Sequence, residues 1–164
     1  IWSAGCSTGE EPYSLAMIID ESVNGLSADV KIMATDISTR VLHSAGEGIF
    51  HKDKLKNLSP AMLRKYFQMG CGQWEGHFRI KKDIRNMIRF SRFNLMDTPP
   101  SSYLSDIIFC RNVMIYFDKA TQSALINRFY QCLNTGGYLF IGHSESLTGL
   151  HHDFKYIEPS IYRK

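Results

Sequence analysis

The sequence lacks any apolar run long enough to cross a membrane. Nowhere in its 164 residues do about 18 apolar residues follow one another, and no signal peptide is visible at its start. Internal repeats and low-complexity tracts are missing too. Because 44% of the residues are hydrophobic, the chain predicts a single folded domain with its own core and room for a small insertion.

Cysteine is scarce and scattered. No two of the four cysteines have the CxxC spacing, so the sequence signals neither a zinc site nor a disulfide framework, and we expect no metal. Buried, reduced thiols in a cytoplasmic protein are the favoured interpretation. The four are Cys6, Cys71, Cys110 and Cys132.

Two phosphate-binding patterns are missing, although residues 3–14 have the layout of a cofactor loop: a strand end, a glycine turn and a helix start. No lysine follows Gly9, so the GxxxxGK[ST] pattern fails, and the strict GxGxxG pattern fails as well. Glu10 and Glu11 would repel a pyrophosphate at the helix start and favour a ligand that brings positive charge. The alternative is that both glutamates only complete a capping box with Ser7-Thr8.

Alternation of apolar strands with amphipathic helices predicts a doubly wound, Rossmann-like α/β sheet. A closing hairpin at residues 154–163 is expected to add an antiparallel edge. Asn24-Gly25 is expected to stop the first helix, and 134–137 to close the last. The chain opens inside a strand, which suggests a fragment. Strands are expected at 1–4, 30–35, 87–93, 106–110 and 138–142, and helices at 12–21, 39–46 and 118–133.

The alternation of strands and helices is interrupted in the middle of the chain, where we expect an inserted β-subdomain at residues 58–90. Ser59-Pro60 opens a helix, and the glycine-rich stretch after it, with alternation at 77–80 and 87–90, predicts a small antiparallel hairpin. From His51 to Arg92 eleven Lys/Arg face three Asp/Glu, a net charge of +8 that leaves −5 for the rest. This asymmetry indicates an acidic partner or a solvated charged face.

Polar residues follow four of the predicted strands, where open α/β sheets bind their ligands. In the first, Gly5 permits a tight turn. Asp36 is placed to accept hydrogen bonds from ribose hydroxyls, with helix capping as the alternative. Asn94 could bond an adenine edge, with Leu95 as an apolar wall, or could be a simple turn residue. A ribose without phosphate and an amino group near Glu11 together describe S-adenosylmethionine.

The fourth strand end is the segment from Cys110 to Phe117. A buried strand there delivers Arg111, and a short apolar segment then exposes Tyr116. A guanidinium at such a place is costly unless it faces an anion, so Arg111 indicates either a negatively charged ligand or a salt bridge to a nearby acid.

Taken together, the motifs closely resemble the CheR family, the bacterial methyltransferases of chemotaxis receptors, over essentially the whole chain. The motifs that carry the resemblance are residues 2–14, Ala34–Ile37, Phe93–Leu95, Arg111–Phe117 and Gly142–Ser146.

This resemblance implies transfer of a methyl group from S-adenosylmethionine, with S-adenosylhomocysteine as product, to glutamates on the cytoplasmic part of the receptors. By position, Glu11 would hold the methionine part, Asp36 the ribose, and Asn94-Leu95 the adenine region. Cys110-Arg111 would line the cofactor near the methyl, and Tyr116 would face the reacting carboxylate.

The resemblance also bears on domain organisation. It implies a methyltransferase domain made of residues 1–57 and 91–164, with 58–90 as the family's β-subdomain. In some members of the family this subdomain captures a peptide at the receptor's C-terminal tail. The matching positions here are Gly70, Gly72, Gly76 and Arg79. The alternative is that the glycines only shape a hairpin. The family's N-terminal helical domain has no counterpart in this sequence, so the chain alone is expected to be weakly active or inactive.

Two alternatives stay open. A nucleic-acid methyltransferase is suggested by the basic insert with its interleaved aromatics, although Arg111-Asn112-Val113 stands where amino-methylating enzymes carry Asn/Asp-Pro-Pro-Tyr/Phe. A non-catalytic module that binds receptor tails or cofactor is the other. We expect no nucleic acid as partner and no insertion into the membrane.

Overall fold

The computed structural model describes residues 1–23, 29–100 and 103–164. The predicted helix stop at Asn24-Gly25 lies outside the described residues. Among the described helices, none has the length and apolar character needed to cross a bilayer. In chain order the elements are β1 (Trp2–Ala4), α1 (Glu10–Ser22), β2 (Ile32–Asp36), α2 (Thr39–Glu47), β3 (Ile49–His51), η1 (Lys52–Leu55), α3 (Pro60–Tyr66), β4 (Phe67–Met69), η2 (Gly72–Trp74), β5 (His77–Ile80), α4 (Lys82–Asn86), β6 (Ile88–Arg92), β7 (Ser105–Cys110), η4 (Met114–Tyr116), α5 (Lys119–Cys132), β8 (Leu133–Ile141), β9 (Lys155–Glu158) and β10 (Ile161–Arg163).

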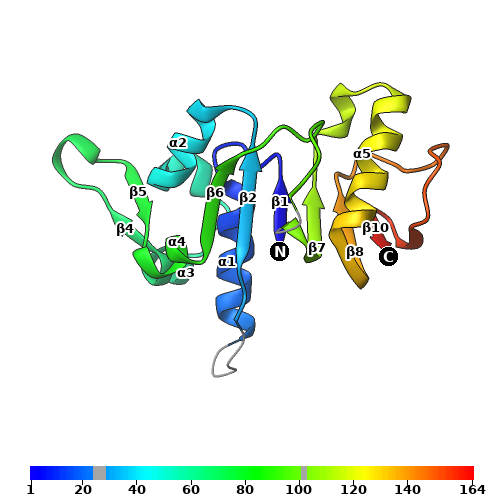
Figure 1. Ribbon diagram of the computed structural model, residues 1–164. Coiled ribbons are helices and arrows are strands. Elements are labelled where there is room, and N and C mark those ends of the chain that lie inside the picture. Colours follow the sequence, from blue (N-terminus) through cyan, green and yellow to red (C-terminus); the bar gives the residue numbers. More distant parts are fainter. Residues whose placement is uncertain (24–28, 101–102) are drawn as a thin grey trace.

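A seven-stranded sheet in the order β6-β2-β1-β7-β8-β10-β9 forms the body of the molecule (Figure 1). The five strands from β6 to β8 are parallel, and β10 pairs antiparallel with both β8 and β9. The order reverses between β1 and β7, so the crevice beside these strand ends is where this architecture binds ligands. The predicted doubly wound sheet with an antiparallel edge is confirmed.

The two helices α1 and α5 pack on opposite faces of the sheet because strand side chains alternate between faces. On one face, buried Trp2 stacks edge-on against Phe129 of α5, with ring centroids 5.3 Å apart. On the other face, Ile32 and Ala34 form a second core with Ala16 of α1. Each face thus has its own buried core, and the loops at the strand ends lie between rigid layers.

A second sheet of three strands, in the order β3-β5-β4, stands beside β6 and α2. The limits expected for the inserted β-subdomain, residues 58 and 90, both differ from those of this sheet. The strand β3 lies before residue 58, and β6 pairs parallel with β2, Ile88 opposite Ile32, in the large sheet. At three residues, β3 is too short for a periodicity signal, and α4 turns the chain back from β5 to the main sheet. The alternation at 87–90 therefore belongs to an edge strand of the main sheet.

Other boundaries also differ from expectation. The predicted closing turn at 134–137 belongs to β8, which follows α5 directly from Leu133. At the start of α1 the cap is Gly9 itself, in the left-handed region at φ 94°, and no side chain caps the helix. The capping-box interpretation of Glu10 and Glu11 is therefore wrong. The predicted cap of α3 is confirmed, because Ser59 Oγ accepts the Met62 amide at 3.2 Å.

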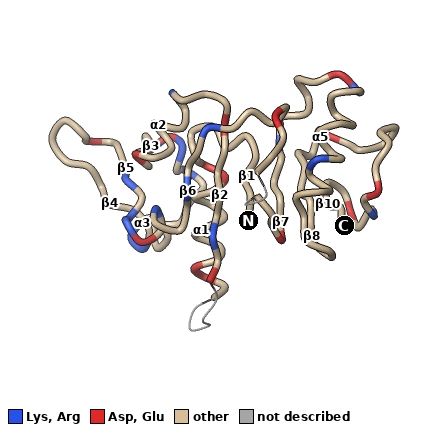
Figure 2. The backbone as a smooth tube through the Cα atoms, in the orientation of Figure 1, with Lys and Arg blue, Asp and Glu red and all other residues tan. Residues whose placement is uncertain are grey.

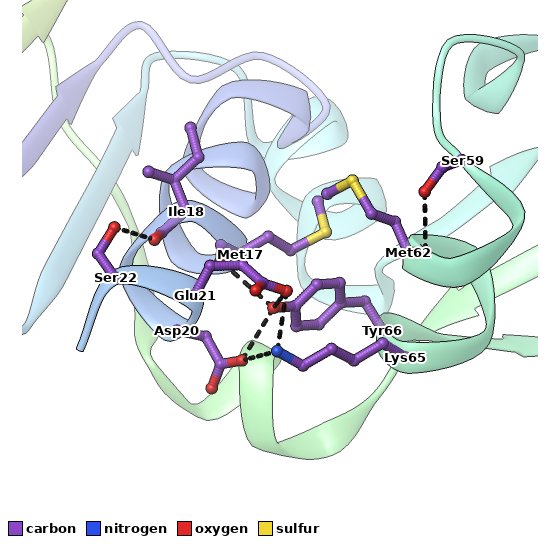
Figure 3. Close-up of polar contacts among 9 residues, drawn as sticks. All are labelled: Met17, Ile18, Asp20, Glu21, Ser22, Ser59, Met62, Lys65 and Tyr66. Carbon is purple, nitrogen blue, oxygen red and sulfur yellow. Dashed lines mark hydrogen bonds and ion pairs between the residues drawn. The ribbon is translucent and has the colours of Figure 1, made fainter. Parts of the chain in front are cut away.

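Tyr66 at the end of α3 fastens the small sheet to α1 (Figure 3). Its ring is buried, and its hydroxyl lies 2.7 Å from Glu21 Oε1 and 2.9 Å from Asp20 Oδ2. Lys65 Nζ lies 2.8 and 3.0 Å from the same two oxygens. Burial raises the pKa of the Tyr66 phenol to about 12, so the hydroxyl keeps its proton at neutral pH and donates it to this acidic pair.

The basic segment is partly neutralised within the molecule. Figure 2 shows its Lys and Arg gathered around α3, β5 and β6. Lys65 meets the acids of α1, Lys56 pairs with Asp53 at 2.8 Å, and Lys54 of η1 pairs with Glu10. Several of the cations that suggested an acidic partner therefore face acids of this same chain.

Candidate functional site

The turn after β1 sits at the centre of the strand-end crevice. The amides of Gly5 and Cys6 both donate to the Thr35 carbonyl of β2, at 2.8 and 2.9 Å. This clamp holds Gly5 at φ +83° and Ser7 at φ 49°. A Cβ on Gly5 would lie 2.5 Å from Val113 Cγ2, so only glycine lets the turn approach the loop after β7 this closely.

Two hollows flank this turn. Gly5, Ser7 and Asn112 line both of them. The first hollow, of about 650 Å³, is also lined by Glu10, Glu11, Arg111 and the face of α1 that carries Ser14, Leu15 and Ile18. The second hollow, of about 470 Å³, is also lined by Asp36, Ile37, Phe93, Asn94, Leu95, Met96, Val113, Tyr116 and Phe117.

Glu11 is the more buried of the two acids that line the first hollow. Its Oε1 accepts the Ser3 hydroxyl at 2.8 Å, and its Oε2 lies 3.5 Å from Arg111 Nη1. Burial raises the pKa of this carboxyl above its ordinary value, against the opposing effects of Ser3 and Arg111. The carboxylate of Glu10 already binds Lys54 and Thr8, so Glu11 is the acid of this hollow that has no lysine partner.

Asp36 shapes the second hollow. One carboxylate oxygen accepts the Ser7 amide at 2.9 Å and the other accepts the Ser38 amide at 3.0 Å. A carboxylate has about four acceptor positions, so two remain for a ligand's hydroxyls. The helix-capping alternative for Asp36 is wrong, because the cap residue of α2 is Ser38 and no side chain caps that helix, whereas the ribose role stays a prediction.

The opposite wall of the second hollow comes from the turn after β6. Asn94 Oδ1 accepts the Met96 amide at 3.1 Å, which folds this turn. Arg128 of α5 donates to the Leu95 carbonyl at 3.1 Å and fixes the wall from behind. With Phe93, Met96 and Phe117 nearby, the hollow offers apolar surface of the kind that a flat heterocycle requires.

The loop after β7 carries Arg111 into the first hollow and Tyr116 into the second, and Tyr116 is 80% exposed. Cys110 differs from its expected role. Its side chain is fully buried in the core on the α5 side, where burial raises its pKa, so it does not line either hollow. The cause is strand alternation, because Cys110 faces the same side as Ile108.

Sequence reasoning missed three residues here. Ser7 and Asn112 line both hollows, and both have positive φ, at 49° and 57°. Asn tolerates this conformation, but the sequence gives no sign that it is used. Glu145 is buried and accepts backbone amides of the loop after β7. It lies in a polar stretch more than 30 residues from those amides, and no local pattern indicates such a contact.

The four small-sheet positions gather on two adjoining hollows. Gly70 and Arg79 line one, with the exposed side chains of Met69 and Trp74, and Gly72 and Gly76 line the other. A Cβ on Gly70 would lie 2.2 Å from the Trp74 carbonyl oxygen, so glycine is required beneath η2. Among the described residues, no group of three or more His, Cys, Asp or Glu is placed to hold a metal ion.

Comparison with known proteins agrees with this geometry. The family model described as "CheR methyltransferase, SAM binding domain" matches residues 1–163. The chain is 45% identical over 167 residues to a chemotaxis protein methyltransferase of Borreliella burgdorferi, covering 100% of this chain and 58% of that protein. It is 42% identical over 165 residues to the Escherichia coli protein of the same name, covering 99% and 57%. The chain thus spans somewhat over half the length of these relatives.

A solved structure supports the fold. A SAM-dependent methyltransferase from Methanosarcina mazei aligns with a TM-score of 0.50 at 17% identity, covering 85% of this chain and 50% of that one. At this identity the likeness concerns the architecture of the sheet alone. The family match names the cofactor, S-adenosylmethionine, as the sequence predicts.

Proposed function

Because the chain belongs to the family of CheR methyltransferase SAM-binding domains, we propose that the full-length protein methylates glutamate side chains on the cytoplasmic part of chemotaxis receptors. The observation that carries the proposal is the pair of hollows on either side of the Gly5–Ser7 turn. One presents the half-buried carboxylate of Glu11, and the other presents Asp36 beside an apolar wall. The place of action that follows is the cytoplasm.

The residues present fit S-adenosylmethionine. Glu11 would receive the ammonium of the methionine part, since a half-buried carboxylate is best satisfied by a cation. Asp36 would accept the ribose hydroxyls with its two open acceptor positions, and the wall at Asn94-Leu95 would receive the adenine. Gly5 lines both hollows and has no side chain, so its backbone can lie close to a ligand.

The chemistry requires positioning more than proton transfer. A glutamate side chain has an ordinary pKa of about 4.3, so the substrate carboxylate is already an anion at neutral pH and needs no base. S-adenosylmethionine supplies, when bound, an electrophilic methyl group on a sulfonium. Arg111 and Tyr116 then have the task of orienting the incoming carboxylate with their N–H and O–H donors. Arg111 is already held at Glu11, which keeps its guanidinium inside the crevice.

Titration with S-adenosylhomocysteine tests the cofactor site. We expect saturable binding that weakens at least tenfold in Asp36→Ala, because hydrogen bonds to a charged acceptor contribute about 1.5–3 kcal/mol. Isothermal calorimetry on wild type and variant measures it. Asp153→Ala is the matched control, because Asp153 is an exposed aspartate that lines neither hollow. Equal affinities for wild type and Asp36→Ala would remove Asp36 from the site.

The raised pKa of Glu11 gives the affinity a definite pH dependence. Without ligand this carboxyl takes up a proton at a higher pH than usual, whereas an ammonium beside it favours the charged form. Binding therefore releases a proton when the pH lies near the raised pKa, and S-adenosylhomocysteine should bind progressively less tightly as the pH falls toward and through that pKa. Calorimetry in two buffers that differ in their heat of ionisation measures how many protons are released on binding. In Glu11→Gln the slope should vanish, and a slope that survives would assign the proton to another group.

We further propose that the small sheet binds the C-terminal tail of the receptor. The strand β4 is at the edge of the sheet and can accept an extended peptide as an added strand. Beside it the exposed Met69 and Trp74 supply apolar surface, and Arg79 supplies a cation for an acidic group of the peptide. These contacts support the proposal that Gly70, Gly72, Gly76 and Arg79 belong to a peptide site.

A thiol reagent can report on this site. Cys71 is exposed and lines both small-sheet hollows, whereas Cys6, Cys110 and Cys132 are buried. Burial also raises the pKa of the Cys6 thiol to about 12. Of the four thiols of this chain we expect Cys71 alone to react fast, with that reaction lost in Cys71→Ser and at least fivefold slower when a receptor-tail peptide is added. A peptide of scrambled sequence is the control, and an unchanged rate at saturating tail peptide would contradict docking here.

A further inference from the structure

Glu145 holds the loop after β7 by its backbone. Its Oε1 accepts the amides of Val113 and Met114 at 2.9 and 2.8 Å, and its Oε2 accepts the amides of Asn112 and Gly142 at 3.1 and 2.6 Å. The residue is only 9% exposed. One buried side chain thus fixes three consecutive peptide groups of the loop that carries Arg111 and Tyr116.

The backbone of the loop is shaped to receive this carboxylate. Asn112 is left-handed at φ 57°, and Val113 is right-handed at φ −115° and ψ −45°. This succession turns neighbouring amides toward a common point, which makes a concavity for an anion. Four amides use the four acceptor positions of the carboxylate, so Glu145 has none left for a ligand. It cannot act on the substrate directly.

Gly142 permits the approach of Glu145 from the other side. A Cβ at Gly142 would lie 2.7 Å from Glu145 Oε2 and 2.8 Å from Asn112 Oδ1. A second contact braces the same loop from α5, where Gln122 Nε2 donates to the Met114 and Phe117 carbonyls at 2.9 and 3.0 Å. The loop is therefore held on its amide side by Glu145 and on its carbonyl side by Gln122.

We propose that Glu145 is a positioning residue for methyl transfer, which fixes the geometry of Arg111 and Tyr116 through the amides of the turn between them. The proposal rests on the proposed function, since it assigns those two side chains to the substrate carboxylate. Arg111 directly precedes the held amides, and Tyr116 ends η4, the short helix that begins with Met114. A turn freed from Glu145 would leave both side chains in place on the chain but no longer in a fixed orientation.

Glu145→Gln is the first test, because it keeps the shape but replaces one acceptor oxygen by an amide that can only donate. In the full-length protein we expect kcat to fall at least tenfold while KM for S-adenosylmethionine stays within threefold. Amide hydrogen exchange over residues 112–114 should become at least tenfold faster. Glu158→Gln, on the exposed strand β9, is the control and should change neither. Unchanged kcat, unchanged exchange, or a KM that rises as much as kcat falls would each overturn the proposal.

Glu145→Asp keeps the test decisive if the Gln variant does not fold. Its carboxylate is one methylene too short to meet all four amides, so kcat should fall below wild type with KM preserved, and kcat equal to wild type would overturn the proposal. Gly142→Ala disturbs the same contact from the Gly142 side. If both substitutions act on one shared contact, the loss of kcat in the double variant with Glu145→Asp should be smaller than the sum of the two single losses. Full additivity would count against a shared contact. If the wild-type protein binds cofactor but methylates no receptor, the proposed function is wrong. The amide hydrogen-exchange rates over residues 112–114 would still decide whether Glu145 holds the turn.

Discussion

Gly5→Ala is expected to destabilise the protein by about 2–5 kcal/mol and to weaken S-adenosylhomocysteine binding more than tenfold. A non-glycine residue in the left-handed region costs about 1–2 kcal/mol by itself. The added Cβ would also lie 2.5 Å from Val113 Cγ2, and overpacking of this kind costs about 1–3 kcal/mol. Val113 cannot yield easily, because its amide is bound to Glu145 at 2.9 Å. Chemical denaturation and calorimetry measure the two effects.

Gly149→Ala is the matched control for this experiment. Gly149 has φ +78°, close to the +83° of Gly5, but nothing lies within 4 Å of a Cβ placed on it. It should therefore show the backbone cost alone and no loss of cofactor affinity. If the two variants were equally stable and bound equally well, the close approach of Gly5 to Val113 would have no part in the site.

Tyr116→Phe is expected to lower turnover about 100-fold in the full-length protein and to leave cofactor affinity within a few-fold. Removing one hydrogen-bond donor aimed at the reacting group of an enzyme typically costs about 10²–10³ in kcat. The side chain is 80% exposed, so loss of the hydroxyl should not disturb packing, and thermal unfolding should not shift. Receptor methylation assays and calorimetry on the same preparations measure the two quantities.

Tyr156→Phe is the control, since Tyr156 is also an exposed tyrosine, at 58%, and lies on β9 at the far edge of the sheet. It should retain full turnover. Equal turnover of Tyr116→Phe and wild type would remove the Tyr116 hydroxyl from the mechanism and leave orientation of the carboxylate to Arg111.

The sequence predicts most of the large sheet because its signals are local. Buried strands are short apolar runs, and the residues that follow them, such as Asp36 and Arg111, stand where the polarity changes. The antiparallel edge also follows from the last two apolar segments, and the structure confirms it. The family assignment is confirmed as well, because it rests on several separated motifs rather than on one glycine pattern.

What the sequence does not predict depends on contacts between distant segments. The strand β3 is three residues long and is defined only by its pairing with β5. The strand β6 alternates like a hairpin strand, and only its pairing with β2 places it in the large sheet. The cap at Gly9 depends on its left-handed backbone, whereas the side chains around it resemble a capping box.

In the candidate site, too, local sequence signals predict some residues, and contacts between distant segments determine others. The structure brings Gly5, Glu11, Asp36 and Tyr116 to the two hollows, as the strand-end rule predicts, while their roles toward ligands stay predictions. Cys110 could have been excluded beforehand, because strict alternation from Ile108 turns its side chain into the core. Glu145 stands in the Gly142–Ser146 motif, but its contacts could not have been predicted, because a carboxylate that binds only peptide groups leaves no matching side chain in the sequence.

The distance along the chain between Glu145 and the three loop amides that it holds, 31 to 33 residues, has a consequence for biosynthesis. Ribosomes add about 5–20 residues per second, so the turn after β7 exists for a few seconds before its anchor has been made. Throughout that interval, and in any product cut between α5 and Glu145, every glycine and acid of the cofactor crevice is already present. The residues of the crevice are therefore made before the anchor of this turn, and the site is complete only once residue 145 has been added.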